Sequence, residues 1–174
     1  MSLTNPLVLD TPMDLDAERQ ILGILIKYPH QVDKVIDRLR PSHFYDLAHR
    51  RVYEIIVELY NKQGRISYTQ IYNVLRNDRI TDSPAELLIS LTESFVSLSE
   101  LEPSIAILQY QEGIRRLVKA TDTIKALALD PKQDDLDEIQ ARAQELIFAA
   151  TQKQNVDGDD AKNLLEVLNK CYLN

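Results

Sequence analysis

The feature that most constrains the fold is a pair of apolar stripes in the last part of the chain. The first stripe is Tyr110, Ile114, Leu117, Thr121, Ile124 and Ala128, and the second is Leu136, Ile139, Ala143, Leu146 and Ala150. Both advance in alternating steps of three and four residues, which places their side chains along one side of an α-helix. Asp130-Pro131 separates them, because proline cannot continue a helix. Residues 103–152 are therefore predicted to form a long antiparallel αα-hairpin with coiled-coil-like packing.

Shorter amphipathic segments fill residues 13–102, which we expect to be a compact multi-helix globule. The first helix should start at Asp14 or Asp16, since an acidic cap suits the positive end of a helix. Gly23 inside this helix costs about 1 kcal/mol relative to alanine. We therefore expect another helix to approach closely there. A second helix is predicted from the spacing of Val32, Val35, Ile36 and Leu39, ending at Pro41.

Two capping boxes are predicted in the second half of this globule. Ser67-Tyr68-Thr69-Gln70 and Ser83-Pro84-Ala85-Glu86 each place a serine three residues before Gln or Glu, so that two backbone N–H groups can be satisfied reciprocally. His49 is expected to be a residue at a helix start that hydrogen-bonds locally. The remaining segments are a flexible leader (1–12), a polar linker (153–160) and a short linker helix (161–174).

Composition supports an all-α fold and opposes some functions. Only 4 of 174 residues are glycine, fewer than a β-sandwich with its many turns would need. The net charge of −7 opposes a general nucleic-acid-binding surface. The single cysteine, Cys171, excludes an internal disulfide framework and a Cys-rich zinc site. No signal peptide or apolar run of membrane-spanning length is present, and we expect a cytoplasmic protein.

The sequence carries no recognisable catalytic, cofactor-binding or metal-binding constellation. None of the four glycines opens a phosphate-binding loop, and the three histidines lack metal-ligand spacing. The interest lies instead in surfaces. Arg115, Arg116 and Lys119 form a tight basic cluster, either a solvated helix face or a contact for an acidic partner helix or DNA. The last helix presents Leu164, Leu165, Leu168 and Tyr172 and is too short to be stable alone, so it should pack on a neighbour.

Two motifs resemble those of DnaB-family bacterial replicative helicases. Residues 14–25 read Asp-Leu-Asp-Ala-Glu-Arg-Gln-Ile-Leu-Gly-Ile-Leu, similar to the opening Asn-Leu-Glu-Ala-Glu-x-x-x-Leu-Gly-x-Leu of that family. His43-Phe44-Tyr45 and, further on, residues 49–53 (His-Arg-Arg-Val-Tyr) resemble the family's Asp-Phe-Tyr and His-Arg-x-Ile-Phe. Weaker similarity extends from 143–151, the end of the second hairpin arm, to the linker helix. The resemblance covers residues 13–173 and identifies the chain as the N-terminal domain of such a helicase, without its motor.

The resemblance implies a non-catalytic role in assembly. Family N-terminal domains pair as dimers, and three dimers form a collar on the hexamer that docks primase. Self-association, primase and a helicase loader are therefore the implied partners, with DNA contacted only indirectly and no membrane. We place the interface on Tyr110, Ile114, Arg115, Arg116, Leu117, Lys119, Ile124, Leu136, Ile139, Leu146, Leu164, Leu165, Leu168 and Tyr172. The parent protein would be an ATP-dependent DNA helicase, and the chain either a fragment of it or a stand-alone paralogue.

The sequence also departs from the family. The Gly-Gly-x-x-Tyr-Leu motif is replaced by residues 82–88 (Asp-Ser-Pro-Ala-Glu-Leu-Leu), and the family's Tyr-Ala-x-Ile-Val at the start of the hairpin is unrecognisable. Two alternatives stay open at this point. One is the helicase-interacting domain of a primase, which shares a related globule and hairpin. The other is a small helix-turn-helix DNA-binding protein with residues 67–76 as one helix, which the acidic balance opposes.

Overall fold

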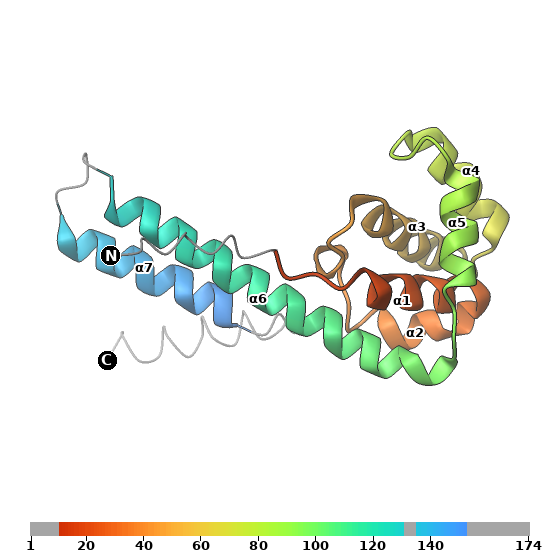
Figure 1. Cartoon of the computed structure of the whole chain (residues 1–174), viewed down its shortest axis with the longest axis horizontal. Coiled ribbons are helices and arrows are strands. Elements are labelled where there is room, and N and C mark those ends of the chain that lie inside the picture. Colours follow the sequence, from red (N-terminus) through yellow and green to blue (C-terminus); the bar gives the residue numbers. More distant parts are fainter. Residues whose placement is uncertain (1–10, 131–134, 153–174) are drawn as a thin grey trace, which may run out of the picture.

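The computed structural model describes residues 11–130 and 135–152, and this part of the chain is helical and contains no strand. A globule of short helices occupies one end, and a two-helix hairpin projects from it, as Figure 1 shows. The predicted all-α class is confirmed. In chain order the elements are α1 (Leu15–Lys27), η1 (Pro29–Gln31), α2 (Val32–Val35), η2 (Pro41–His43), α3 (Leu47–Gln63), α4 (Tyr68–Asp78), α5 (Pro84–Glu93), η3 (Leu98–Glu100), α6 (Leu101–Ala128) and α7 (Leu136–Thr151).

Helix α1 is the centre of the globule. It starts as predicted, because the Asp14 carboxylate caps it by accepting the Ala17 N–H at 2.9 Å. Its residues from Ile21 to Ile26 are all buried, as they pack against α3, α5 and α6 on different sides. A helix covered all round needs apolar residues on every face, which explains the unbroken run that the sequence shows there.

Gly23 is the point where α5 crosses α1. A Cβ atom built at Gly23 would overlap the backbone carbonyl oxygen of Leu91 and lie 3.6 Å from Cβ of Phe95. The predicted close approach of a second helix at this glycine is therefore confirmed. Gln20, one turn earlier, holds the end of α5 by donating to the Ser94 carbonyl and accepting the Val96 N–H.

The segment after α1 is less regular than its spacing predicted. Helix α2 covers only Val32–Val35, and a turn follows before the 3-10 helix η2. The expected helix to Leu39 is therefore wrong in length. Its apolar residues are nevertheless inside, with Val32, Val35 and Leu39 all buried. The Leu39 carbonyl accepts the hydroxyl of buried Tyr53 at 2.9 Å, a tertiary bond that replaces a helical one.

The two predicted capping boxes form only in part. Ser67 does cap α4 by accepting the Gln70 N–H at 3.4 Å, but Oε1 of Gln70 accepts the Ser67 hydroxyl at 3.0 Å instead of the Ser67 backbone N–H that a capping box requires. Ser83 makes no side-chain cap bond to α5, and that prediction is wrong. Pro84 at the first position of α5 starts the helix instead, because its fixed φ is already helical.

Helix α6 joins the globule to the hairpin. It begins at Leu101, two residues before Pro103, which is tolerated in the first turn because the N–H groups there have no partner within the helix. Leu101, Ile105 and Leu108 belong to the globule's core. The second half of α6 runs beside α7 (Figure 1). The domain division at residue 102 stays a prediction. The first two turns of α6 pack into the core of the globule.

Candidate functional site: the helical hairpin

The hairpin is held together by one row of small and aliphatic side chains from each helix. On α7 the least exposed residues are Ile139, Ala143, Leu146 and Ala150, in the three- and four-residue steps of the predicted stripe. On α6 the row facing them includes Ala120, Ile124 and Leu127. The interior between the helices is therefore narrow. The α7 stripe is the packing stripe, whereas on α6 the packing row lies to one side of the predicted stripe.

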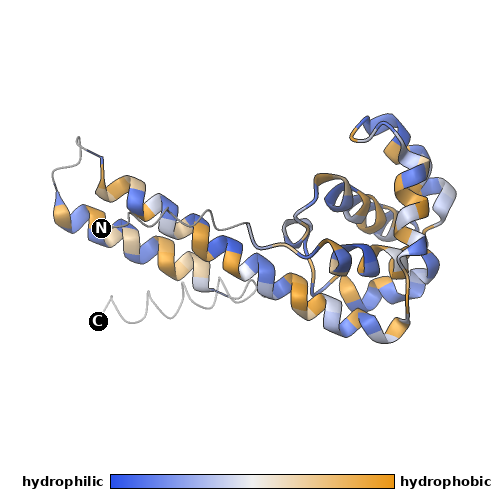
Figure 2. Ribbon diagram, viewed as in Figure 1, coloured by the Kyte–Doolittle hydropathy of each residue, from blue (hydrophilic) through white to orange (hydrophobic). Residues whose placement is uncertain are grey.

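The rest of the predicted α6 stripe faces outward. Tyr110 is 67% exposed and Leu117 is 41% exposed, while Ile114 is half-buried. On α7, Leu136, Ile147 and Phe148 are also largely exposed. Orange segments recur along both arms of the hairpin in Figure 2, so apolar residues occur throughout its length. Two packed helices have no third layer to cover such side chains, and exposed apolar surface of this kind marks interaction sites.

Arg115 joins α6 to the globule rather than reaching into solvent. Its Nη1 donates to the Pro12 carbonyl at 2.9 Å, and its Nη2 donates to the carbonyls of Ser42 and His43 at 3.1 and 2.9 Å. The guanidinium also lies over the Tyr45 ring, 6.0 Å from its centroid. Burial lowers the pKa of Arg115 from its ordinary value, although the guanidinium stays charged. Its main role is that of an internal clamp, which neither sequence interpretation of the basic cluster included.

Arg116 plays a similar part within the hairpin. Its Nη1 donates to the Gln152 carbonyl at 2.8 Å, which satisfies an open backbone group at the end of α7. Its Nε lies 2.9 Å from the Glu112 carboxylate in the geometry of an ion pair rather than of a directed hydrogen bond. Lys119, the third member of the cluster, is exposed. The predicted interface residues Leu164, Leu165, Leu168 and Tyr172 lie outside the described residues.

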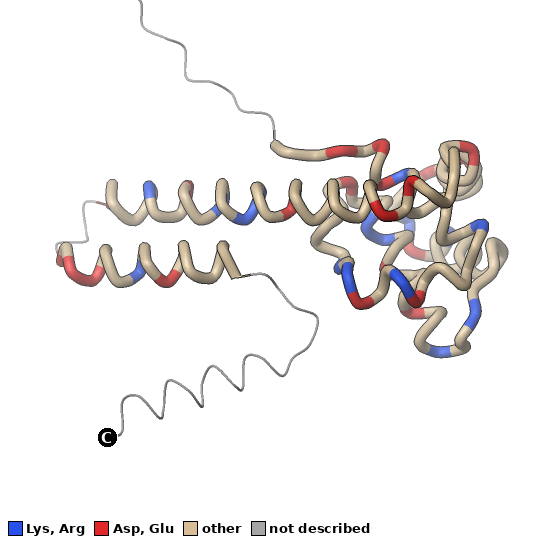
Figure 3. The backbone as a smooth tube through the Cα atoms, turned by 90° about the horizontal axis from the view of Figure 1, so that it is seen from below, with Lys and Arg blue, Asp and Glu red and all other residues tan. Residues whose placement is uncertain are grey.

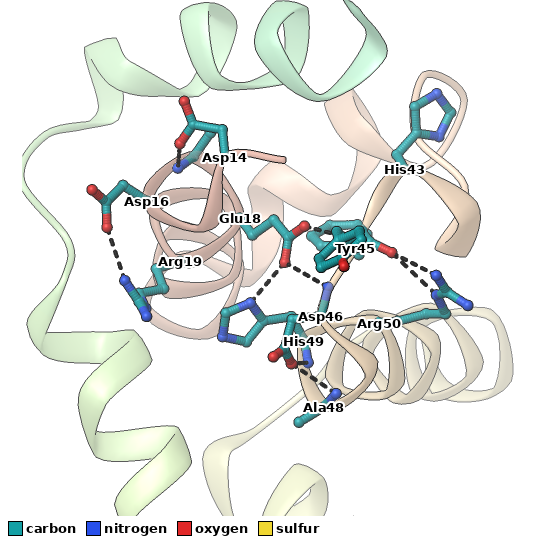
Figure 4. A network of polar contacts seen from close by, with 12 residues as sticks. Asp14, Asp16, Glu18, Arg19, His43, Tyr45, Asp46, Ala48, His49 and Arg50 are labelled. Carbon is teal, nitrogen blue, oxygen red and sulfur yellow. Dashed lines mark hydrogen bonds and ion pairs between the residues drawn. The ribbon is translucent and has the colours of Figure 1, made fainter. Parts of the chain in front are cut away.

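A buried polar contact that sequence reasoning missed joins the two resemblance motifs. Glu18 of α1 is completely buried, and its carboxylate accepts the backbone N–H of Tyr45 and, at 3.4 Å, that of Asp46. It also lies 2.8 Å from Nδ1 of buried His49 at the start of α3 (Figure 4). Because a carboxylate only accepts, Nδ1 of His49 carries the proton.

This contact corrects the expectation for His49, which bonds across the fold rather than locally. The side chain of Asp46 caps α3 by accepting the N–H groups of Ala48 and His49 at 2.8 and 2.9 Å. In the sequence, this contact was indicated only by position: Glu18 of the first motif and His49 of the second both lie close to the start of a helix. The network positions α1 against α3 and lies away from the hairpin's exposed surface, so we assign it a structural role.

Two basic residues of the globule, Arg50 and Arg51, are also engaged. Arg50 donates to the Phe44 carbonyl at 3.1 and 2.9 Å. Arg51 pairs with Asp78, Glu54 and Glu58, and the hydrogen bond to Asp78 contributes most to raising its pKa. Blue and red residues alternate over the globule in Figure 3, without a continuous basic face in that view. This arrangement does not favour the helix-turn-helix alternative.

The described residues contain neither a metal-binding cluster nor a helix suited to cross a membrane. Within residues 11–130 and 135–152, no group of three or more acidic, histidine or cysteine side chains could hold a metal ion. Over the same ranges, no helix combines the length and apolar character that crossing a membrane requires.

The chain is similar in sequence to a part of replicative DNA helicases. It is 23% identical over 161 residues to the replicative DNA helicase DnaB of Pasteurella multocida, covering 91% of this chain and 34% of that protein. It is 21% identical over 165 residues to the replicative DNA helicase DnaC of Bacillus subtilis, covering 94% of this chain and 36% of that protein. The chain thus spans about a third of the length of these relatives.

A solved structure and a family model agree with these matches. The crystal structure of the N-terminal domain of DnaB helicase from Mycobacterium tuberculosis superposes with a TM-score of 0.71 at 25% identity, covering 80% of this chain and 99% of that one. The model of the DnaB-like helicase N terminal domain matches residues 10–110. That match covers more than half of the chain and includes both motifs joined by Glu18 and His49. The protein therefore belongs to the DnaB-like helicase N-terminal domain family.

Proposed function

We propose that this domain is a non-catalytic assembly and partner-docking module of a replicative DNA helicase. In this proposal it pairs with a second copy, and three pairs form the N-terminal collar of a hexamer. The ATP-dependent motor would belong to the parent helicase, and the complex would work in the cytoplasm. Family membership and the match to helicases along most of the chain support this role over that of a primase domain.

The observation that carries the proposal is the uncovered apolar surface of the hairpin. Tyr110 and Leu117 are separated by seven residues and so share one side of α6, which borders the row of Ala120, Ile124 and Leu127 that faces α7. Because Leu117 is only 41% exposed, burying the rest of its side chain at an interface contributes about 1 kcal/mol. In a pair of hairpins related by a two-fold axis, the stripe of each copy would pack against the same surface of the other copy, so both stripes would be covered.

Self-association tests this proposal directly. Sedimentation velocity from low to high micromolar concentration should show a dimer, and hydrogen exchange within α6 and α7 should slow as the concentration rises. Leu117→Glu should weaken dimerisation by tenfold or more, because about 1.4 kcal/mol is a factor of ten and a charge would be placed in an apolar contact. Gln144→Glu introduces the same charge at an exposed polar position of α7 and should leave dimerisation unchanged.

The result against the proposal is a protein that stays monomeric throughout this range with unchanged hydrogen exchange in the hairpin. Equal effects of Leu117→Glu and Gln144→Glu would also count against it, because they would indicate general charge repulsion rather than loss of an apolar contact.

Primase docking is the second part of the proposal. It is supported by the family resemblance and by the presence of further exposed apolar side chains, such as Ile147 and Phe148, on α7. Purified primase from the same organism should bind the domain or its dimer in a calorimetric titration, and Phe148→Asp should weaken binding without altering helicity. If no heat and no co-migration were observed at high micromolar concentrations, primase docking would be excluded. The assembly role would then be decided by the sedimentation experiment alone.

A further inference from the structure

A groove runs along the side of α6 that faces away from the packing row. It has a volume of about 670 Å³, and its apolar lining comes from Ile114, Val118 and Ala126. Lys119, Asp122 and Thr123 add polar groups to its lining. Val118 is 45% exposed although it lies in the middle of the helix. An apolar trough with polar edges is suited to an extended peptide with alternating or consecutive aliphatic side chains.

The chain itself enters this groove. Thr11 and Pro12 form part of its lining, and the Pro12 carbonyl is held by Nη1 of Arg115 at 2.9 Å. In Figure 1 the red segment that precedes α1 lies beside the middle of α6. Arg115 also grips the carbonyls of Ser42 and His43, so the point of entry is tied to the globule. The residues that come immediately before Thr11 therefore start from one end of the groove.

The chemistry of those residues matches the groove. Leu7, Val8 and Leu9 are consecutive aliphatic residues, and Asp10 is the single charged side chain between residues 2 and 10. Lys119 lies one turn beyond Arg115 on α6, about 6 Å along its axis. Asp10 lies two residues before Pro12, about 7 Å along an extended chain. The spacing of Arg115 and Lys119 along α6 therefore matches the spacing of Pro12 and Asp10 along an extended chain. Arg115 binds the Pro12 carbonyl, and Lys119 is placed to pair with the Asp10 carboxylate.

The length also matches. Ile114 to Ala126 spans about 18 Å at 1.5 Å per helical residue, and an extended chain covers that distance with about five or six residues. Counting back from Thr11, a segment of this length comprises residues 5–10.

We propose that residues 5–10 of this chain lie extended along α6 of the same chain and fill the groove between Ile114 and Ala126, with Leu7, Val8 and Leu9 as the apolar contacts. The segment covers a side of α6 different from the side of Leu117, so this docking is separate from the proposed self-association and does not depend on it. It would stiffen the connection between globule and hairpin, because α6 would be held both at Arg115 and further out.

Paramagnetic broadening in NMR spectra tests the proposal on the full chain. A nitroxide is attached at Asn5→Cys in a Cys171→Ser background, which leaves the three aliphatic residues intact. We expect strong broadening of the amides of residues 122–129. Val118→Asp should abolish it by placing a charge in the groove. Leu117→Asp has a similar starting exposure of 41% but points about 100° away around the helix, and it should leave the broadening in place.

A mixed sample identifies the occupant. Spin-labelled chain without ¹⁵N is added to ¹⁵N-labelled chain without the nitroxide, so that only contacts between copies broaden the signals. Broadening equal to that of the doubly labelled chain would overturn the proposal in favour of a second copy in the groove. Absence of broadening in both samples, or its persistence in Val118→Asp, would overturn docking in the groove altogether. The amide spectra themselves show whether each variant is folded.

Discussion

Replacing glycine by alanine is expected to change the free energy of unfolding in opposite directions at two helical glycines, because only Gly23 lies at the crossing of α1 and α5. Gly23→Ala and Gly113→Ala both replace a glycine inside a helix, where alanine is favoured by about 1 kcal/mol. At Gly113 nothing lies within 4 Å of the new methyl group, so the helix preference decides. Gly113→Ala should therefore increase the free energy of unfolding by about 0.5–1 kcal/mol.

At Gly23 the same gain is outweighed. The methyl group would overlap the Leu91 carbonyl oxygen, which belongs to the backbone of α5 and can move only if the whole helix shifts. Overpacking of a tightly packed core typically costs about 1–3 kcal/mol, and a clash with backbone belongs at the upper end of that range. After subtracting about 1 kcal/mol of helix preference, Gly23→Ala should lower the free energy of unfolding by about 2 kcal/mol.

Urea denaturation followed by circular dichroism measures both values. The two variants should differ by about 3 kcal/mol with equal dependence on urea, since the surface exposed on unfolding is the same. The reasoning would be refuted if Gly23→Ala matched or exceeded wild-type stability while Gly113→Ala behaved as expected. That result would mean that α5 can retreat from α1 at little cost.

Three further predictions concern polar contacts. Glu18→Gln should lower the free energy of unfolding by about 2–4 kcal/mol in the same assay, because a buried acceptor of several N–H groups is weakened beside His49; an unchanged urea midpoint would contradict this. The Asp33 carboxylate accepts the hydroxyl of Tyr60 and raises the pKa of that phenol, so ultraviolet titration should show a lower Tyr60 pKa in Asp33→Asn. Since the folded-state pKa is the higher one, the associated stabilisation is complete below the ordinary value of 10.0 and is lost as the pH rises through the folded value; an unchanged titration curve would rule out the contact. Arg115→Lys should speed hydrogen exchange at the junction of α6 and the globule, because an ammonium cannot span three carbonyls as a planar guanidinium does, and wild-type exchange rates there would refute the clamp.

The helices that the sequence predicted well are those with local signals. Asp14 caps α1 and Ser67 caps α4, both at the predicted positions. Each of these signals acts between residues a few positions apart. Where local signals were weak or in conflict with packing, the prediction failed, as for the helix expected up to Leu39 and the box expected at Ser83.

The candidate surface was predicted less completely. The α7 stripe packs as expected, but the α6 stripe is divided between half-buried and exposed positions, because the first part of α6 also serves the globule. An apolar stripe indicates that a helix face will be covered without saying by which neighbour. For the same reason, Arg115 and Arg116 looked like free cations in the sequence although their donors are used on backbone carbonyls.

Periodicity, caps and two short motifs were sufficient to determine the all-α class, the hairpin and the family, since each depends on residues close together in the sequence. Only the tertiary structure decided that Glu18 meets His49, that Leu91 of α5 excludes a side chain at Gly23, and that Arg115 ties α6 to Pro12. These contacts join residues 31, 68 and 103 positions apart. Their geometry depends on how whole helices pack, and no local pattern in the sequence encodes it.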